Sequence, residues 1–220
     1  MNRRYAILGD IHANLEALLN EHLQLKSLSL VVHDWGGAIG MGYAVRHPER
    51  IKRIVLMNTA AFLPGRCPWR IRMCRIPGLG ALAIRGLNAF ALSAARMAVG
   101  KGHALADRAR AGLLYPYDSW HHRAGILRFV QDIPLTSRHP TWDTLATIQK
   151  SLHLLADKPM LICWGGQDFC FNDGYLAVWQ RYFPRAVVHR FDDAGHYVLE
   201  DARDRVVPLV KGFLDEAAAT

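Results

Sequence analysis

The segment His33–Gly37, which reads HDWGG, constrains the fold of this 220-residue chain more than any other part of the sequence. It follows the β-like run Ser27–Val32 and precedes a helical stretch that reaches about Arg46. A polar side chain on a tight turn from strand to helix, flanked by small residues, is the arrangement of a nucleophile elbow. The pattern therefore predicts an α/β fold that presents Asp34 at the carboxyl end of a strand.

The rest of the chain continues this alternation of strands and helices. Further β-like runs lie at Arg53–Met57, Pro159–Cys163 and Ala186–Phe191. We also expect helices over residues 14–25, 174–182 and 205–217. Four strands separated by helical segments predict a mostly parallel sheet.

The alternation lapses between residues 63 and 155, where the sequence is helical, rich in arginine and interrupted by prolines. Such an insertion falls where a lid would cover the carboxyl ends of the strands, which is the edge at which open α/β sheets bind ligands. We therefore assign residues 1–62 and 156–220 to an α/β core and residues 63–155 to a helical cap.

Two further polar motifs each follow a predicted strand. Residues 164–168 read WGGQD and residues 193–196 read DAGH. The chain order is therefore that of nucleophile, acid and histidine in α/β-hydrolase triads. Asp34, as a carboxylate, needs no base to attack carbon, and His196, held by Asp168, would deprotonate the water that cleaves the resulting ester. Taken singly, Asp34 could merely cap the following helix and the other two could be ordinary loop residues, but their joint order favours catalysis.

These motifs resemble the haloalkane-dehalogenase-like branch of the α/β-hydrolase superfamily. The resemblance is carried by HDWGG at 33–37, NTAAF at 58–62, WGGQD at 164–168 and DAGHYVLED at 193–201. The chain is also similar to bacterial β-lactone decarboxylases of long-chain olefin biosynthesis. That second similarity is carried by NAF at 88–90, PYDSW at 116–120, RFVQDIPL at 128–135 and GQDFCF at 166–171.

The resemblance implies a cofactor-free enzyme without a metal, with Asp34 as nucleophile, Asp168 as acid and His196 as base. It implies that the backbone N–H of Trp35 is an oxyanion donor and that its indole lines the site. Asn58 is expected at the substrate-binding edge, and as an amide it leaves Asp168 as the acid. The implied substrate is a small apolar molecule: a long-chain β-lactone, opened and decarboxylated to an alkene, with an alkyl halide or an epoxide as the alternatives.

The sequence also departs from this family. Its members begin with further strands, and a His-Gly loop after one of them supplies a second oxyanion donor. No such segment is recognisable upstream of Asp34. Loss of one oxyanion donor typically costs about a hundredfold in rate. An inactive truncated fragment, or a subunit that depends on a partner, is therefore the alternative to an active enzyme.

The N-terminus carries a competing motif. Residues 6–18 read AILGDIHANLEAL, in which Asp10, His12 and Asn14 resemble the first motif of calcineurin-like metallophosphoesterases, whose metal ions activate water. The later motifs of those enzymes, which supply the other metal ligands, are not recognisable. A metallophosphoesterase-like N-terminus is therefore kept only as an alternative to the hydrolase interpretation.

Composition bounds the partners and the compartment. The net charge is +8, but no nucleic-acid-binding module is recognisable, so we expect a solvated basic face and no nucleic acid as partner. The four cysteines form no zinc-type pair and no signal peptide is recognisable, which favours the cytoplasm. The apolar stretch between residues 76 and 99 is interrupted by charges and predicts one buried or interfacial amphipathic helix, which could dock to a membrane surface or a partner enzyme.

Overall fold

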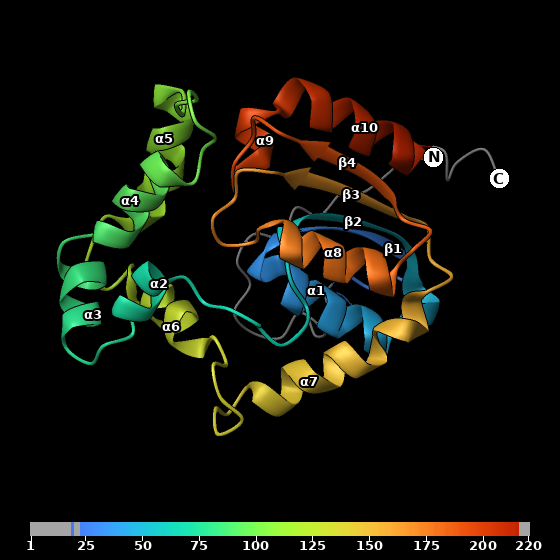
Figure 1. Cartoon of the computed structure of the whole chain (residues 1–220), viewed down its shortest axis with the longest axis horizontal. Coiled ribbons are helices and arrows are strands. Elements are labelled where there is room, and N and C mark those ends of the chain that lie inside the picture. The colour runs from blue at the N-terminus through green and yellow to red at the C-terminus, as the bar shows by residue number, and fades with distance from the viewer. Residues whose placement is uncertain (1–18, 20–22, 216–220) are drawn as a thin grey trace.

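The computed structural model describes residues 19 and 23–215, and a four-stranded parallel sheet in the order β1-β2-β3-β4 forms the centre of this part (Figure 1). The strands are β1 (Leu28–Asp34), β2 (Ile51–Thr59), β3 (Met160–Gly165) and β4 (Val187–Phe191). The expected α/β fold with four parallel strands is confirmed. Because β1 and β2 extend beyond their predicted ends, His33, Asp34 and Asn58 belong to strands.

The two central strands, β2 and β3, are buried on both faces because they are apolar at consecutive positions. In β3, Leu161 and Cys163 belong to the core on one face, whereas Ile162 and Trp164 belong to the core on the other. Successive side chains of a strand point to opposite faces, so a strand that is covered on both sides needs an unbroken apolar run. Cys163 is a buried free thiol, and burial raises its pKa to about 12.

Helices cover the two faces of the sheet. One face carries α1 (Trp35–Arg46), α7 (Trp142–Ser151) and α8 (Asp173–Tyr182), and the other carries α9 (Val198–Asp201) and α10 (Arg203–Asp215) (Figure 1). The short helices η2 (Pro48–Arg50) and η5 (Leu152–Leu155) precede β2 and β3. α8 agrees with its predicted range, and α10 begins slightly earlier than predicted. The helix predicted over residues 14–25 lies largely outside the described residues.

A separate group of short helices lies on the side of the sheet to which the strand arrows point (Figure 1). The group comprises α2 (Trp69–Met73), α3 (Leu79–Ala81), η3 (Leu82–Gly86), α4 (Ala89–Met97), α5 (Asp107–Leu114), η4 (Tyr115–Tyr117) and α6 (Ala124–Asp132). It has a small apolar core of its own, to which Ile84, Ile126 and Val130 contribute.

The prediction of one amphipathic helix between residues 76 and 99 is wrong. Asn88 adopts a left-handed backbone conformation with a φ of 52°, through which a right-handed helix does not continue. The stretch is therefore divided into α3, η3 and α4, and Leu82 and Leu87 stay exposed. None of the described helices is long and apolar enough to cross a membrane.

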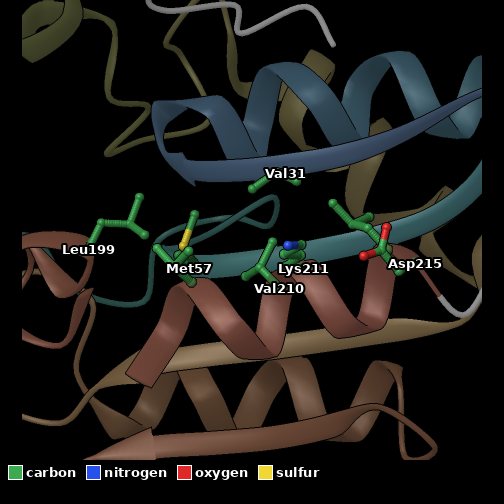
Figure 2. Close-up of a pocket in the computed structure, with 8 residues that line it drawn as sticks. Val31, Met57, Leu199, Val210, Lys211 and Asp215 are labelled. Carbon is green, nitrogen blue, oxygen red and sulfur yellow. The ribbon is translucent and has the colours of Figure 1, made fainter. Parts of the chain in front are cut away.

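β1 forms one edge of the described sheet, and an apolar groove of about 370 Å³ lies beside it (Figure 2). Val31 of β1 and Met57 of β2 line this groove together with Leu199 of α9 and Val210 of α10. Val31 is 46% exposed, although valines of parallel sheets are usually buried. The edge of β1 is therefore an accessible apolar surface, and no predicted site residue lines it.

Candidate active site

Asp34 lies at the junction of β1 and α1 in a strained backbone conformation. Its φ of 50° and ψ of −126° fall in a region that residues with a side chain rarely adopt. The Thr59 hydroxyl donates a hydrogen bond to the backbone carbonyl of Asp34, which ties this turn to the end of β2. The Asp34 side chain is 44% exposed, so the turn presents an accessible carboxylate.

The two glycines after Trp35 differ in how tightly they are packed. A Cβ atom on Gly37 would lie 1.8 Å from Thr59 Oγ1 and 2.8 Å from Thr59 Cβ. For Gly36, the nearest heavy atom to an added Cβ would be Val32 Cβ, at 3.8 Å. The close approach of α1 to β2 therefore requires glycine at position 37 and not at position 36.

His196 and Asp168 meet beside Asp34. His196 Nδ1–H donates a 2.7 Å hydrogen bond to Asp168 Oδ2, and the other ring nitrogen, Nε2, lies 4.0 Å from Asp34 Oδ1. The Asp168 side chain is fully buried, and its Oδ1 accepts the backbone N–H groups of Cys170 at 2.7 Å and Phe171 at 3.1 Å. The structure thus brings together the three side chains that the sequence predicts as nucleophile, acid and base.

Two carboxylates determine the protonation of His196. Burial lowers its pKa, but the charge of Asp168, the hydrogen bond to it and the charge of Asp34 together outweigh burial, so the pKa of His196 is raised. Because Nδ1 donates to Asp168, the proton that His196 gains or loses is the one on Nε2. The arrangement can therefore move a proton at the nitrogen that faces Asp34.

His33 is a further member of the site, and the sequence analysis did not single it out. Its Nε2–H donates to the backbone carbonyl of His196 at 2.8 Å, and the centroids of the two imidazole rings are 4.5 Å apart. Burial, followed by the nearby His196, lowers the pKa of His33 to about 4. His33 is therefore a neutral hydrogen-bond donor near neutral pH. Its position beside Asp34 in HDWGG is the signal that could have found it.

Aromatic side chains surround these polar groups. The Trp35 ring lies 5.1 Å from the Phe129 ring of α6, and the Phe171 ring stacks on His196 at 5.8 Å. Burial is the main cause that raises the pKa of Tyr197 to about 12, so its hydroxyl keeps its proton. The motifs RFVQDIPL, GQDFCF and DAGHYVLED contain Phe129, Phe171 and Tyr197, which is the sequence signal that points to these residues.

The hydrogen bonds of Asn58 go to the backbone of β3 and not to the three predicted catalytic side chains, so its role in substrate binding stays a prediction. Asn58 is fully buried, its Nδ2–H donates to the Gly165 carbonyl at 3.0 Å, and its Oδ1 accepts the Gly165 N–H at 2.7 Å. In the pairing of β1 with β2, His33 lies opposite Met57 and Asp34 lies opposite Thr59. Asn58 is therefore the residue of β2 that is skipped by this register shift. Both polar ends of the amide are therefore used to join the ends of β2 and β3.

Within the described residues, no group of three or more His, Cys, Asp or Glu side chains is arranged to hold a metal ion. The metallophosphoesterase-like motif with Asp10 and His12 lies outside the described residues. The four cysteines are all free thiols.

Comparisons with known proteins indicate the family of the chain. The sequence model described as the alpha/beta hydrolase family matches residues 3–209. The chain is similar to a cis-3-alkyl-4-alkyloxetan-2-one decarboxylase from Shewanella oneidensis, with 46% identity over 206 residues, which cover 92% of this chain and 64% of that protein. A protein of the same name from Xanthomonas campestris is 42% identical over 92% of this chain and 68% of that protein.

The fold is also that of solved structures. A haloalkane dehalogenase from Bradyrhizobium elkani has a TM-score of 0.81 at 21% identity, over 92% of this chain and 72% of that chain. This chain thus spans 64% of the length of the Shewanella relative and 72% of the solved structure. The match of the family model to residues 3–209 shows that the chain belongs to the alpha/beta hydrolase family.

Proposed function

We propose that this chain carries the reactive centre of a β-lactone decarboxylase, with Asp34 as nucleophile and with His196 held in place by Asp168. The observation that carries the proposal is the Asp34 carboxylate on a strained turn, 4.0 Å from the Nε2 of a histidine that a buried carboxylate orients. Such a carboxylate can attack carbon without a separate base. The 46% identity to an oxetanone decarboxylase supports the choice of substrate.

The proposed reaction consumes no water. An Asp34 oxygen attacks the saturated ring carbon that is bonded to the ring oxygen, and an ester bond forms. The bond between that carbon and the ring oxygen breaks, which leaves a carboxylate on the neighbouring carbon. That carboxylate then leaves as CO2. The electrons of the broken carbon–carbon bond form the double bond of the alkene, and Asp34 departs with the electrons of the ester bond. The lactone is thereby converted into an alkene and CO2, and the Asp34 carboxylate is regenerated.

His196 governs the fate of the ester in this proposal. As a cation, it stabilises the Asp34 carboxylate as that group departs, and Asp168 stabilises the cation. As a neutral base, it would instead activate water against the ester, and the product would be a hydroxy acid. The charge of Asp168 and the hydrogen bond to it raise the pKa of His196 and persist when Asp34 is an ester, so they favour the cation and therefore the alkene. The backbone N–H of Trp35, at the first position of α1, lacks an acceptor within its helix and stabilises the same developing charge.

The surroundings of Asp34 support an apolar substrate. Trp35 contacts Phe129 of α6, and Phe171 stacks on His196, so aromatic rings from both the core and the helical insertion adjoin the reacting groups. Alkyl chains gain free energy when such surfaces exclude water from them, by about 0.8 kcal/mol for each buried CH2 group. The short helices from α2 to α6 serve as the cap that covers these chains. The end of the expected cap of residues 63–155 does not belong to it, because Ile148 of α7 and Leu152 of η5 pack in the core of the sheet.

Product analysis tests the proposal directly. The purified chain is incubated with a cis-3,4-dialkyl β-lactone, and the headspace and extract are analysed for CO2 and cis-alkene by gas chromatography and mass spectrometry. Asp34→Ala should lose activity by at least about a thousandfold, as expected when a nucleophile is removed. Asp173→Ala is the matched control, because this exposed carboxylate on α8 bonds only Arg190 among the interactions resolved for it. Turnover by Asp34→Ala at the wild-type rate would refute the nucleophile.

A second measurement looks for the ester itself. In His196→Gln, Asp34 departs without the help of a cation, so the mass of the lactone should accumulate on the protein. Intact-protein mass spectrometry and peptide mapping would locate this mass at Asp34. Halide release from a chloroalkane, without alkene from the lactone, would assign the site to dehalogenation instead.

A further inference from the structure

We propose that Asp201 is a positioning residue that couples the helical insertion to His196. The Asp201 side chain is 2% exposed, and its Oδ2 accepts two backbone hydrogen bonds from segments far apart in the sequence. The Gly195 N–H, directly before His196, donates at 2.7 Å. The Gly100 N–H, shortly after α4 in the insertion, donates at 2.6 Å. One buried oxygen therefore joins the loop of the histidine to the insertion.

The two segments also lie against each other along their backbones. The Tyr197 N–H donates to the Ala98 carbonyl at 2.9 Å. A Cβ atom on Gly195 would lie 2.6 Å from that carbonyl oxygen and 2.8 Å from Gly100 N, so this approach requires glycine. Of the two chain neighbours of His196, Tyr197 thus bonds Ala98 and Gly195 packs closely against residues 98–100.

The same segment contacts the loop of the acid. The Lys101 N–H donates to Gln167 Oε1 at 2.6 Å, and Gln167 directly precedes Asp168. His103 Nδ1 lies 3.7 Å from Asp201 Oδ1, the oxygen that does not accept the two backbone bonds. The end of α4 and the residues after it therefore touch the loops that carry both members of the His196–Asp168 pair.

The chemistry of this position suits a carboxylate. One carboxylate oxygen can accept two N–H groups, and charge-assisted hydrogen bonds are about twice as strong as neutral ones. Removal of Asp201 would leave the buried N–H groups of Gly100 and Gly195 without this acceptor. Gly195 directly precedes His196 and helps to position its backbone. Release of Gly195 should therefore weaken the hydrogen bond between His196 and Asp168. The catalytic consequence rests on the proposed function, whereas the coupling itself does not.

Native-state hydrogen exchange of the full chain, followed by NMR, tests the coupling without a substrate. The Gly100 and Gly195 amides share one acceptor, so in the wild type we expect their exchange rates to agree within about tenfold. In Asp201→Ala both amides should exchange roughly 10- to 100-fold faster, as the loss of a hydrogen bond to a charged group implies. Asp204→Ala is the matched control, because this carboxylate lies exposed in the first turn of α10, three residues after Asp201, and it should leave both rates unchanged.

A titration of the His196 ring by NMR distinguishes positioning from a merely structural role. Asp201→Ala should lower the pKa of His196, and Asp201→Asn, which keeps an acceptor oxygen, should recover part of the loss. A folded Asp201→Ala chain with the wild-type pKa at His196 would overturn the proposal. The proposal would also be overturned if the Gly100 amide of the wild type exchanged more than about a hundredfold faster than the Gly195 amide. This comparison needs only the wild type, so it decides the question even if Asp201→Ala does not fold. Neither readout uses turnover, so a failure of the decarboxylase proposal would be recognised separately.

Discussion

Alanine at position 37 should destabilise the fold, whereas alanine at position 36 should not. A Cβ atom on Gly37 would lie 1.8 Å from Thr59 Oγ1, and Thr59 has no exposed surface into which its side chain could turn. To make room, the Thr59 hydroxyl would have to give up its hydrogen bond to the Asp34 carbonyl. At Gly36 the nearest atom would be 3.8 Å away, which is an ordinary van der Waals contact.

The expected free energies separate the two variants. Alanine favours a helix over glycine by about 0.5–1 kcal/mol, and this gain applies to both positions. Gly37→Ala also incurs an overpacking cost of about 1–3 kcal/mol and the loss of a hydrogen bond worth about 1 kcal/mol. The net destabilisation is then about 1–3 kcal/mol, which lowers the Tm of a chain of this size by roughly 3–10 °C. Gly36→Ala should keep its Tm or raise it slightly.

Thermal melts followed by circular dichroism would measure these shifts. Adding Thr59→Ala to Gly37→Ala removes Oγ1 and Cγ2, so the double variant should lose less stability than the sum of the single variants, with a coupling of at least about 1 kcal/mol. If Gly36→Ala and Gly37→Ala melted within about 1 °C of each other, the packing argument would be refuted.

Three further predictions follow from the described contacts. The pKa of His33 is about 4 in the folded chain, against 6.5 for an unperturbed histidine. Its contribution to stability is therefore complete above pH 6.5 and should fall by up to roughly 3 kcal/mol as the pH drops toward 4. His33→Gln, which keeps a side-chain N–H donor and does not titrate, should flatten this acid limb in urea melts, and an identical limb would contradict the argument. Asp168→Asn removes the charge that contributes most to the raised pKa of His196, so an NMR titration should find that pKa lowered, and an unchanged value would exclude Asp168 as its cause. We expect the chain expressed alone to associate through the apolar edge of β1. Val31→Lys should then raise the monomer fraction in size-exclusion chromatography. An unchanged elution profile would count against association at this edge.

The order of the main elements and the approximate place of the site could be predicted from local patterns. An apolar β-run followed by HDWGG predicts a strand, a tight turn and a helix, because side-chain alternation and the steric freedom of glycine act over a few residues. The carboxyl ends of parallel strands lie along one edge of a sheet. Asp34, Asp168 and His196, each near such an end, were therefore expected to converge. In the structure, His196 Nε2 lies 4.0 Å from Asp34 Oδ1, and His196 Nδ1 lies 2.7 Å from Asp168 Oδ2.

The exact partners of individual side chains were decided by the tertiary structure. Asn58 follows the same strand-end rule as Asp34, yet the shift in pairing between β1 and β2 directs its amide to Gly165 of β3. Likewise, nothing near Asp201 in the sequence shows that Gly100 will reach its carboxylate.

The physical reason is the distance along the chain over which each contact acts. Propensity and periodicity describe interactions between near neighbours, and on that basis they predict the strands, the elbow and the helices α1, α8 and α10. The hydrogen bond of His33 to His196 joins residues that are 163 positions apart, and that of Gly100 to Asp201 joins residues that are 101 positions apart. Such bonds form only after the sheet and the helices have packed, because packing brings the backbones together and excludes the water that would otherwise compete for each donor and acceptor. The sequence by itself therefore determined which chemical groups stand at the strand ends, and the packed fold decided which of them act on one another.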